Sequence, residues 1–303
     1  MNILQITKGA LMGGGERHVL SLFKGFRGWP VNMSLAVFTD GKLAAAAREL
    51  GIEVHVVPKR FRGDLSPLPA LVWLIKQKRI DIVHTHLLSG NFYGRLSGKA
   101  AGVKGIVTTL HHADREALGG STVPFLTNLL FHLDISMTAF SDRVITPSAD
   151  LKRHIAQKGV KPEKIVHIPN AVDLDCVEIA DGDGLACRQE LGLSPGLKAV
   201  GMVGRLVTVK NFPLFLRAAR RVVDAGVQAR FLVIGDGPLR NELQRMAEKL
   251  RLTRDVIFTG FRQDIIRVVS SLDLFVLCSD SEVFPLALIE AMALGKPVIA
   301  TDV

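Results

Sequence analysis

The sequence predicts an α/β protein built from two doubly wound parallel-sheet domains, and three observations support this fold class. Short apolar runs rich in Val and Ile alternate with longer amphipathic segments along the 303-residue chain, as in βαβ units. Aromatic residues make up only 6% of the chain, so Val, Ile, Leu and Ala must fill the cores, which is typical of parallel sheets covered by helices. The alternation stops at a turn-rich stretch and then restarts, which indicates two domains.

The first domain is expected over residues 1–172, with each strand a short β-branched run and each helix a longer segment between two strands. Its predicted strands are residues 3–7, 33–38, 53–57, 80–84, 106–110, 143–147 and 165–168. Its predicted helices are residues 16–26, 42–50, 68–78, 90–101, 124–140 and 149–158.

A linker is expected over residues 173–197, where turn-forming residues cluster and one short helix is predicted near residues 185–191. The second domain then covers residues 198–303. Its predicted strands are residues 199–203, 230–234, 256–258, 274–277 and 298–300, and its predicted helices are residues 212–225, 239–251, 264–271 and 286–294. Because no closing helix follows the last strand, we expect this domain to be incomplete in a truncated chain. Two such domains would place a ligand cleft between them, at the carboxyl ends of their strands.

The net charge of +9 lies in the first third of the chain, where residues 1–110 hold 15 Lys and Arg against 6 Asp and Glu. Aromatic residues show no repeated pattern there, so nucleic acid is not an expected partner. Two basic segments, Lys59-Arg60-Phe61-Arg62 and Lys76-Gln77-Lys78-Arg79, lie near Trp73. They could bind an anionic membrane surface or form a solvated face, and the charge pattern leaves both open.

Cysteine usage and the absence of an apolar span indicate a cytoplasmic protein, soluble or lying on a membrane. The three cysteines form no C-x-x-C pair and are odd in number, so neither a disulfide framework nor a thiolate zinc site is expected. The first residues lead directly into a strand without a leader, and no segment reaches the roughly 18 consecutive apolar residues of a spanning helix.

A glycine-rich turn follows the first predicted strand, at Gly13-Gly14-Gly15-Glu16. Without side chains, the backbone N–H groups can approach a phosphate, and the positive end of the next helix favours an anion. A flexible βα loop without a ligand explains the same residues.

Two cations follow the first strand of the second domain, in Gly204-Arg205 and Lys210-Asn211. Cations near a helix N-terminus oppose its macrodipole, which suggests that an anion lies between them. A diphosphate fits, because Arg can hold two oxygens while Lys supplies a point charge. The alternative is a solvated charged loop.

Two glutamates, Glu282 and Glu290, flank a predicted helix start at Pro285 in the run S-E-V-F-P-L-A-L-I-E-A-M-A. Glu282 is expected in the loop and Glu290 within the helix, so that the two carboxylates could hold different hydroxyl-bearing parts of one ligand. Glu290 stands among apolar residues, where an unpaired carboxylate is costly, and a salt bridge is the alternative explanation.

Six motifs together resemble the retaining family-4 glycosyltransferases of the GT-B fold, which has two Rossmann-like domains. They are G-R-L-V-T-V-K-N at residues 204–211, G-D-G-P-L at 235–239, E-x7-E at 282–290, G-G-x-E at 13–16, D-I-V-H-T-H at 81–86 and I-P-N-x-V-D at 168–173. The motifs occur in the order of the family and extend over nearly the whole chain.

The resemblance implies a role for each matched residue. Arg205 and Lys210 would neutralise the donor diphosphate, and Glu282 would hold hydroxyls of the transferred sugar. Glu290 would hold the ribose hydroxyls of the nucleotide. The remaining expected site residues are Gly13 and Gly14 at the donor phosphates and sugar, His111 near the sugar, and Phe284, Pro285 and Leu286 beside the nucleotide.

The implied reaction is transfer of a sugar, with retention, from a nucleotide-diphosphate-sugar donor to a hydroxyl acceptor. A lipid-linked or cell-envelope glycan is the expected acceptor class, and no cofactor or metal is expected. The chain departs from the family pattern at Ala171, His112 and Val283, which affects the local loop geometry more than the reaction.

Three other interpretations remain open. His84 and His86, with His111-His112, could hold the metal of a hydrolase, although no matching carboxylate stands out. Asp181-x-Asp183 imitates a metal-binding D-x-D but lies among ordinary turn residues. A truncated chain could also be a remnant that binds a nucleotide sugar without catalysis.

Overall fold

The computed structural model describes residues 1–9, 12–61, 63–111, 124–174 and 183–303. Contacts divide the chain into two compact units, Met1–Ala171 (unit 1) and Val172–Val303 (unit 2), which are described separately. Three residues named above, Arg62, His112 and Asp181, lie outside the described residues, as does one of the three cysteines, Cys176.

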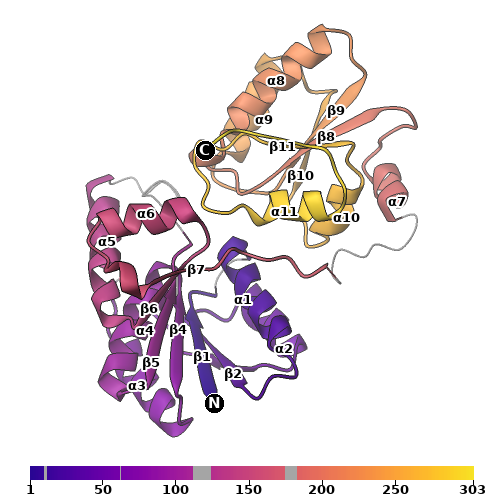
Figure 1. Ribbon diagram of the computed structural model, residues 1–303. Helices are drawn as coiled ribbons and strands as arrows, with labels where there is room; N and C mark the ends of the chain where they lie inside the picture. Colours follow the sequence, from indigo (N-terminus) through magenta and orange to yellow (C-terminus); the bar gives the residue numbers. More distant parts are fainter. Residues whose placement is uncertain (10–11, 62, 112–123, 175–182) are drawn as a thin grey trace. The chain divides into compact units, whose positions relative to one another are not determined.

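A parallel sheet forms the centre of unit 1, with strand order β3-β2-β1-β4-β5-β6-β7 (Figure 1). Its strands are β1 (Asn2–Thr7), β2 (Asn32–Val37), β3 (Glu53–Val56), β4 (Ile82–His86), β5 (Gly105–Thr109), β6 (Arg143–Thr146) and β7 (Ile165–His167). The register places Gln5 of β1 beside His84 of β4, and His86 beside Thr109 of β5. The strand order reverses between β1 and β4, which is the switch point where doubly wound folds bind ligands.

Helices cover both faces of this sheet (Figure 1). They are α1 (Gly14–Gly25), α2 (Lys42–Glu49), α3 (Pro67–Gln77), α4 (Leu87–Ala101), α5 (Pro124–Ser136) and α6 (Ala149–Gln157), with short 3-10 helices η2 (Met137–Phe140) and η3 (Pro162–Lys164). Strand side chains alternate between the faces, so Ile3 packs with Phe23 of α1 while Leu4 packs with Leu71 of α3. Gln5 shares the face of Ile3.

Unit 2 repeats this architecture with a smaller parallel sheet of order β10-β9-β8-β11-β12. Its strands are β8 (Lys198–Val203), β9 (Ala229–Ile234), β10 (Val256–Gly260), β11 (Leu274–Leu277) and β12 (Val298–Ala300). Its helices are α7 (Asp183–Glu190), η5 (Thr208–Lys210), α8 (Phe212–Asp224), α9 (Arg240–Lys249), α10 (Ile265–Ser270) and α11 (Leu286–Ala293).

The two faces of the unit 2 sheet have separate cores. Phe215 of α8 and Leu243 of α9 pack on one face, and Val268 of α10 and Ala291 of α11 pack on the other (Figure 1). The predicted fold class, two doubly wound α/β domains, is therefore confirmed, and the second unit has the smaller sheet. Within the described residues, no helix combines the length and apolar character needed to cross a membrane.

Candidate functional site

Two loops of unit 2 pack backbone against backbone at the carboxyl ends of β8 and β9. Gly204 N donates to Ile234 O (3.0 Å), and Leu206 N donates to Asp236 O (3.0 Å). A Cβ added to Gly235, whose φ is +136°, would lie 2.0 Å from Gly204 O, and one added to Gly237 would lie 2.5 Å from Leu206 O. Because only glycine permits this approach, these glycines fix the loop that carries Arg205.

The start of α8 is fastened to the loop after β11. Asn211 adopts a left-handed conformation (φ 49°, ψ 44°), and its Oδ1 caps the helix by accepting from Leu214 N (3.2 Å). Its Nδ2 donates to Asp280 Oδ1 (2.7 Å), and Asp280 N donates to Val209 O (2.8 Å). These bonds place Lys210 beside the end of β11.

Lys210 and Glu282 form an ion pair at the carboxyl ends of the neighbouring strands β8 and β11. Glu282 Oε1 also accepts from Ser279 Oγ (2.6 Å), and Ser279 O accepts from Thr301 Oγ1 (2.6 Å). The exposed fractions of the side chains are 24% for Lys210 and 12% for Glu282, so solvent screens the pair only partly. The structure therefore brings together a cation and a carboxylate that the sequence places 72 positions apart.

The other predicted residues of unit 2 lie on the same loops and on α11. Arg205 is exposed in the loop after β8 and forms no ion pair with the described residues. Pro285 is the N-cap of α11 in an extended conformation, Leu286 is the first helical residue, and Phe284 is half-buried before them. Glu290 is 4% exposed on α11.

A second cluster of predicted residues lies at the carboxyl edge of the unit 1 sheet. Gly13 is the N-cap of α1, and its N–H donates to Glu16 Oε2 (3.1 Å). A Cβ on Gly15 would lie 3.0 Å from Leu87 Cδ2 and 3.6 Å from the ring of His111, so this glycine lets the first turn of α1 approach both. Leu87 has φ +59°, an unusual value of the kind that concentrates at functional sites.

Histidines gather beneath this cluster, on the sheet face that α1 covers. The ring centroids of His84 and His86 are 4.2 Å apart, those of His86 and His111 5.4 Å, and those of His18 and His111 5.2 Å. Hydrogen bonds connect these histidines to Gln5, to Thr109 and to one another. The contacts are His84 Nε2 with Thr109 Oγ1 (2.8 Å), His86 Nε2 with Gln5 Oε1 (2.7 Å) and His86 Nδ1 with His111 Nε2 (3.2 Å).

Burial keeps the inner histidines neutral. It lowers the pKa of His84 to about 3, with the charge of His18 adding to the effect. Burial also lowers the pKa of His86 well below its ordinary value, followed by the charges of His84, His111 and His18, and it lowers the pKa of His18. In the part of the chain that the structure describes, no three His, Cys, Asp or Glu side chains are arranged to hold a metal ion. The described residues thus give no support to a metal hydrolase.

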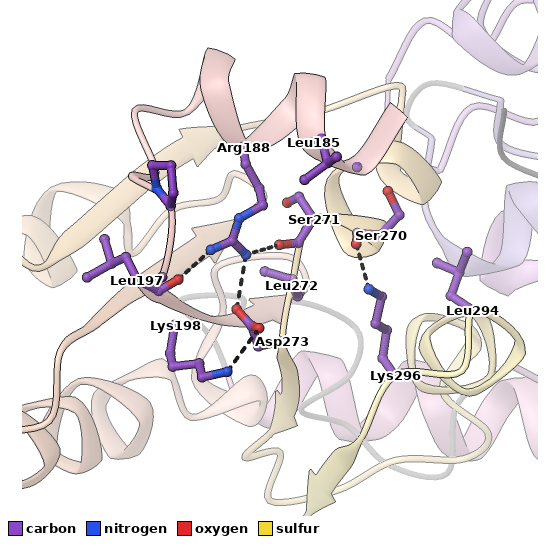
Figure 2. Close-up of a pocket in the computed structure, with 13 residues that line it drawn as sticks. Leu185, Arg188, Leu197, Lys198, Ser270, Ser271, Leu272, Asp273, Leu294 and Lys296 are labelled. Atoms are coloured by element: carbon purple, nitrogen blue, oxygen red, sulfur yellow. Dashed lines mark hydrogen bonds and ion pairs between the residues drawn. The ribbon is translucent and has the colours of Figure 1, made fainter. Parts of the chain in front are cut away.

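A pocket of about 670 Å³ in unit 2 lies at the opposite edge of the sheet, where β8 and β11 begin (Figure 2). Arg188 donates from Nη1 to Ser271 O (2.9 Å) and Asp273 Oδ2 (3.0 Å), and from Nη2 to Leu197 O. Lys296 donates to Ser270 O (2.6 Å). These contacts fasten α7 and α10 to the sheet. Because the pocket lies where the strands begin, it is separate from the predicted site residues, which lie where the strands end.

Sequence reasoning missed three residues that shape the two clusters, and it considered His86 only as a metal ligand. Asp280 carries no sequence signal, because its partners Asn211 and Val209 follow another strand. Nothing in the sequence marks Ser279 as a partner of Glu282, three residues further on. Gln5 has a weak signal as a polar residue inside an apolar strand. The role of His86 beneath His111 could be found only once the register of β4 and β5 was known.

Comparison with known proteins adds independent information. Residues 12–176 match the model of Glycosyltransferase Family 4, and residues 186–303 match that of Glycosyl transferases group 1. The chain is 32% identical to the UDP-Gal:alpha-D-GlcNAc-diphosphoundecaprenol alpha-1,3-galactosyltransferase of Escherichia coli, over 79% of this chain and 62% of that protein. It is 30% identical to the 2-deoxystreptamine glucosyltransferase of Streptomyces kanamyceticus, over 100% of this chain and 80% of that protein.

The fold is also similar to solved structures. The Anabaena protein HepE in complex with UDP-glucose superimposes with a TM-score of 0.87 at 23% identity, over 100% of this chain and 80% of that chain. This likeness supports the GT-B fold, and the family match covers more than half of the chain. The chain belongs to glycosyltransferase family 4.

Proposed function

We propose that this chain transfers a sugar, with retention, from a nucleotide-diphosphate-sugar donor to a hydroxyl acceptor. The observation that carries the proposal is the Lys210–Glu282 ion pair, held at two neighbouring strand ends of unit 2 in a chain of this family. A cation and a carboxylate at one place suit a ligand that has both a diphosphate and a sugar with several hydroxyls. Retention is supported by the family alone.

Lys210 and Arg205 would neutralise the charge that develops on the leaving nucleotide diphosphate, so the proposed reaction uses no metal. Glu282 would accept hydrogen bonds from sugar hydroxyls. Glu290 would do the same for the ribose, beside Phe284, Pro285 and Leu286 at the start of α11. In unit 1, Gly13 and Gly14 at the N-terminus of α1 would bind donor phosphates or sugar, and His111 would contact the sugar.

The proposed acceptor is a lipid-linked or cell-envelope glycan on the cytoplasmic face of a membrane. The name of the Escherichia coli relative includes a diphosphoundecaprenol-linked sugar, which supports this class. A membrane-bound acceptor would require unit 1 or unit 2 to approach an anionic lipid surface.

The surface of α3 and the loop before it suits such an approach, and we call it the α3 surface. It exposes Phe61 (65%), Leu65 (57%) and Trp73 (63%). The cations around it are Lys59, Arg60, Lys76 and Arg79. Asp64 fixes the loop, because its carboxylate accepts from the backbone N–H of Arg60 and of Ser66, both at 2.9 Å. Exposed aromatic rings among cations are typical of membrane interfaces.

A panel of nucleotide sugars tests the proposed activity through release of the nucleotide diphosphate. We expect turnover with at least one donor in the presence of an acceptor, undiminished by EDTA. Binding of a donor without turnover for any acceptor would instead favour a non-catalytic nucleotide-sugar-binding protein. Loss of turnover on chelation would contradict the metal-independent mechanism. The anomeric configuration of the product, measured by NMR, tests retention.

A further inference from the structure

Three side chains that contact one another, Gln5, His86 and His111, lead from the interior of unit 1 to its sheet edge, and we call them the relay. Gln5 on β1 contacts His86 on β4 at 2.7 Å, and His86 contacts His111 after β5 at 3.2 Å. Gln5 is 1% exposed and His86 is fully buried, whereas His111 is half-buried at the carboxyl edge of the sheet. The relay therefore connects the buried amide of Gln5 to the predicted site residue His111.

The proton positions follow from the chemistry of each contact. The carbonyl Oε1 of Gln5 can only accept, so Nε2 of His86 must carry a proton. Because burial keeps His86 neutral, its Nδ1 has a lone pair and accepts. Nε2 of His111 must then be the donor across the 3.2 Å contact. When the ring of His111 is neutral, this leaves Nδ1 as the accepting nitrogen.

We propose that Gln5 and His86 are positioning residues that fix His111 in the Nε2–H tautomer, so that its Nδ1 accepts a hydrogen bond from a ligand hydroxyl. The second part rests on the proposed function, since the hydroxyl is that of the donor sugar. The orientation of the Gln5 amide determines which atom donates in each hydrogen bond of the relay. With an N–H group in place of the carbonyl, both rings would take the opposite tautomer and Nδ1 of His111 would donate.

Uniform ¹⁵N-histidine labelling and long-range ¹H–¹⁵N correlation spectra test the tautomers, because protonated and unprotonated ring nitrogens have distinct shifts. His86→Gln and His111→Gln variants assign the two signals among the nine histidines. We expect both rings to be Nε2–H tautomers in the wild type. An Nδ1–H tautomer of His111 would overturn the proposal. This measurement is made on the wild type and needs no variant of Gln5.

Gln5→Met tests the relay itself, because methionine has a similar length but cannot accept as an amide carbonyl does. We expect a mixture of tautomers at both histidines. Thr109→Val is the matched control. It removes the hydrogen-bond partner of His84 in the same buried layer but leaves the contacts of the relay intact. Wild-type tautomers in a folded Gln5→Met variant would overturn the relay.

Kinetics then connect the tautomer to the reaction. We expect Gln5→Met to lower kcat by about 10-fold, as for partners that orient functional histidines, with the KM of the donor changed less than about twofold. An unchanged kcat would overturn the role of Nδ1. If the wild type itself transfers no sugar, the proposed function fails, whereas the NMR experiment still decides the tautomers.

Discussion

At the scale of single residues, Lys210 and Arg205 occupy one loop but differ in surroundings. Lys210 is paired with Glu282, while Arg205 points to solvent. A bound diphosphate would therefore compete with a carboxylate for Lys210, but would meet Arg205 without displacing a partner within the described residues. The two cations are therefore expected to contribute differently to binding of the diphosphate.

Replacing either cation by Ala should lower donor turnover by about 100-fold or more, since each substitution removes a preorganised charge from the developing diphosphate. Steady-state release of the nucleotide diphosphate measures this. The unfolding midpoint of Arg205→Ala should change little, because Arg205 is exposed. Lys249→Ala, which removes an exposed lysine at the end of α9, should behave as the wild type. Full activity in both Arg205→Ala and Lys210→Ala would exclude the proposed clamp.

The two glutamates are expected to separate into a sugar contact and a nucleotide contact. Glu282→Gln should impair turnover while keeping or increasing affinity for free nucleotide diphosphate, because it removes the carboxylate that competes for Lys210. Glu290→Gln should weaken binding of the free nucleotide, because an amide accepts fewer hydrogen bonds from hydroxyls. Calorimetric titration of nucleotide diphosphate into both variants decides between them. Loss of affinity in Glu282→Gln alone would reverse the assignment.

The buried histidines should make unit 1 sensitive to acid. His84 has a folded pKa of about 3, below its unfolded value near 6.5, so the unfolded chain binds more protons between these values. The contribution of His84 to the free energy of unfolding is therefore fully present above pH 6.5. It decreases as the pH drops towards 3, by up to about 1.4 kcal/mol per pH unit.

Urea unfolding at several pH values between 7.5 and 4.5 measures this dependence. His84→Gln should flatten it, even if the variant is less stable throughout, whereas His132→Gln, at an exposed histidine of α5, should leave the slope unchanged. An equal slope in the wild type and His84→Gln would show that His84 does not carry the effect.

At the scale of elements, periodicity predicted the strands well, because parallel strands buried on both faces read as short apolar runs between amphipathic helices. All strand bounds agree to within two residues. The helix predicted from residue 90 begins at Leu87, whose positive φ allows the chain to turn directly from β4 into α4. Nothing in the identity of Leu87 indicates that conformation.

The site was predictable only in part. Arg205, Lys210, Glu282 and Glu290 are recognisable because family motifs are local in sequence. The Lys210–Glu282 pair was not, because it depends on β8 and β11 being neighbours. The sequence suggested that His84, His86 and His111 could come together, but the contacts between them depend on the register of β1, β4 and β5, which local sequence does not specify.

The backbone contact between the loops after β8 and β9 should be intolerant of any side chain. Gly237→Ala is expected to destabilise unit 2 by about 3 kcal/mol or more, because the new Cβ would meet the backbone of Leu206, which cannot move aside. Gly226→Ala is the matched control, because it has a positive φ but open space around it, and should cost about 1 kcal/mol. Equal unfolding free energies of the two variants would contradict the close approach.

At the scale of the whole molecule, the excess positive charge belongs to unit 1, and part of it surrounds the α3 surface. Each cation near an anionic membrane is worth about 1 kcal/mol. Replacing Lys59, Arg60, Lys76 and Arg79 together by Gln should therefore cost several kcal/mol of membrane affinity.

Cosedimentation with phosphatidylglycerol vesicles at low and high salt measures the effect. The matched control replaces four exposed cations of unit 2, Arg221, Arg245, Lys249 and Arg254, by Gln, and should retain binding. Absence of binding at low salt, or binding insensitive to salt and to the α3-surface substitutions, would leave a soluble acceptor as the better proposal.

The strand order of each sheet has a consequence for the way the protein is made. In unit 1, β1 lies inside the sheet, β2 and β3 extend it on one side, and β4 to β7 then extend it on the other in sequence order. Each strand that emerges from the ribosome can thus join the free edge of the sheet already formed. Unit 2 grows in the same way, with β9 and β10 on one side of β8 before β11 and β12 on the other. Nascent chains can therefore assemble outward during translation, N-terminal unit first, without inserting a late strand between early ones.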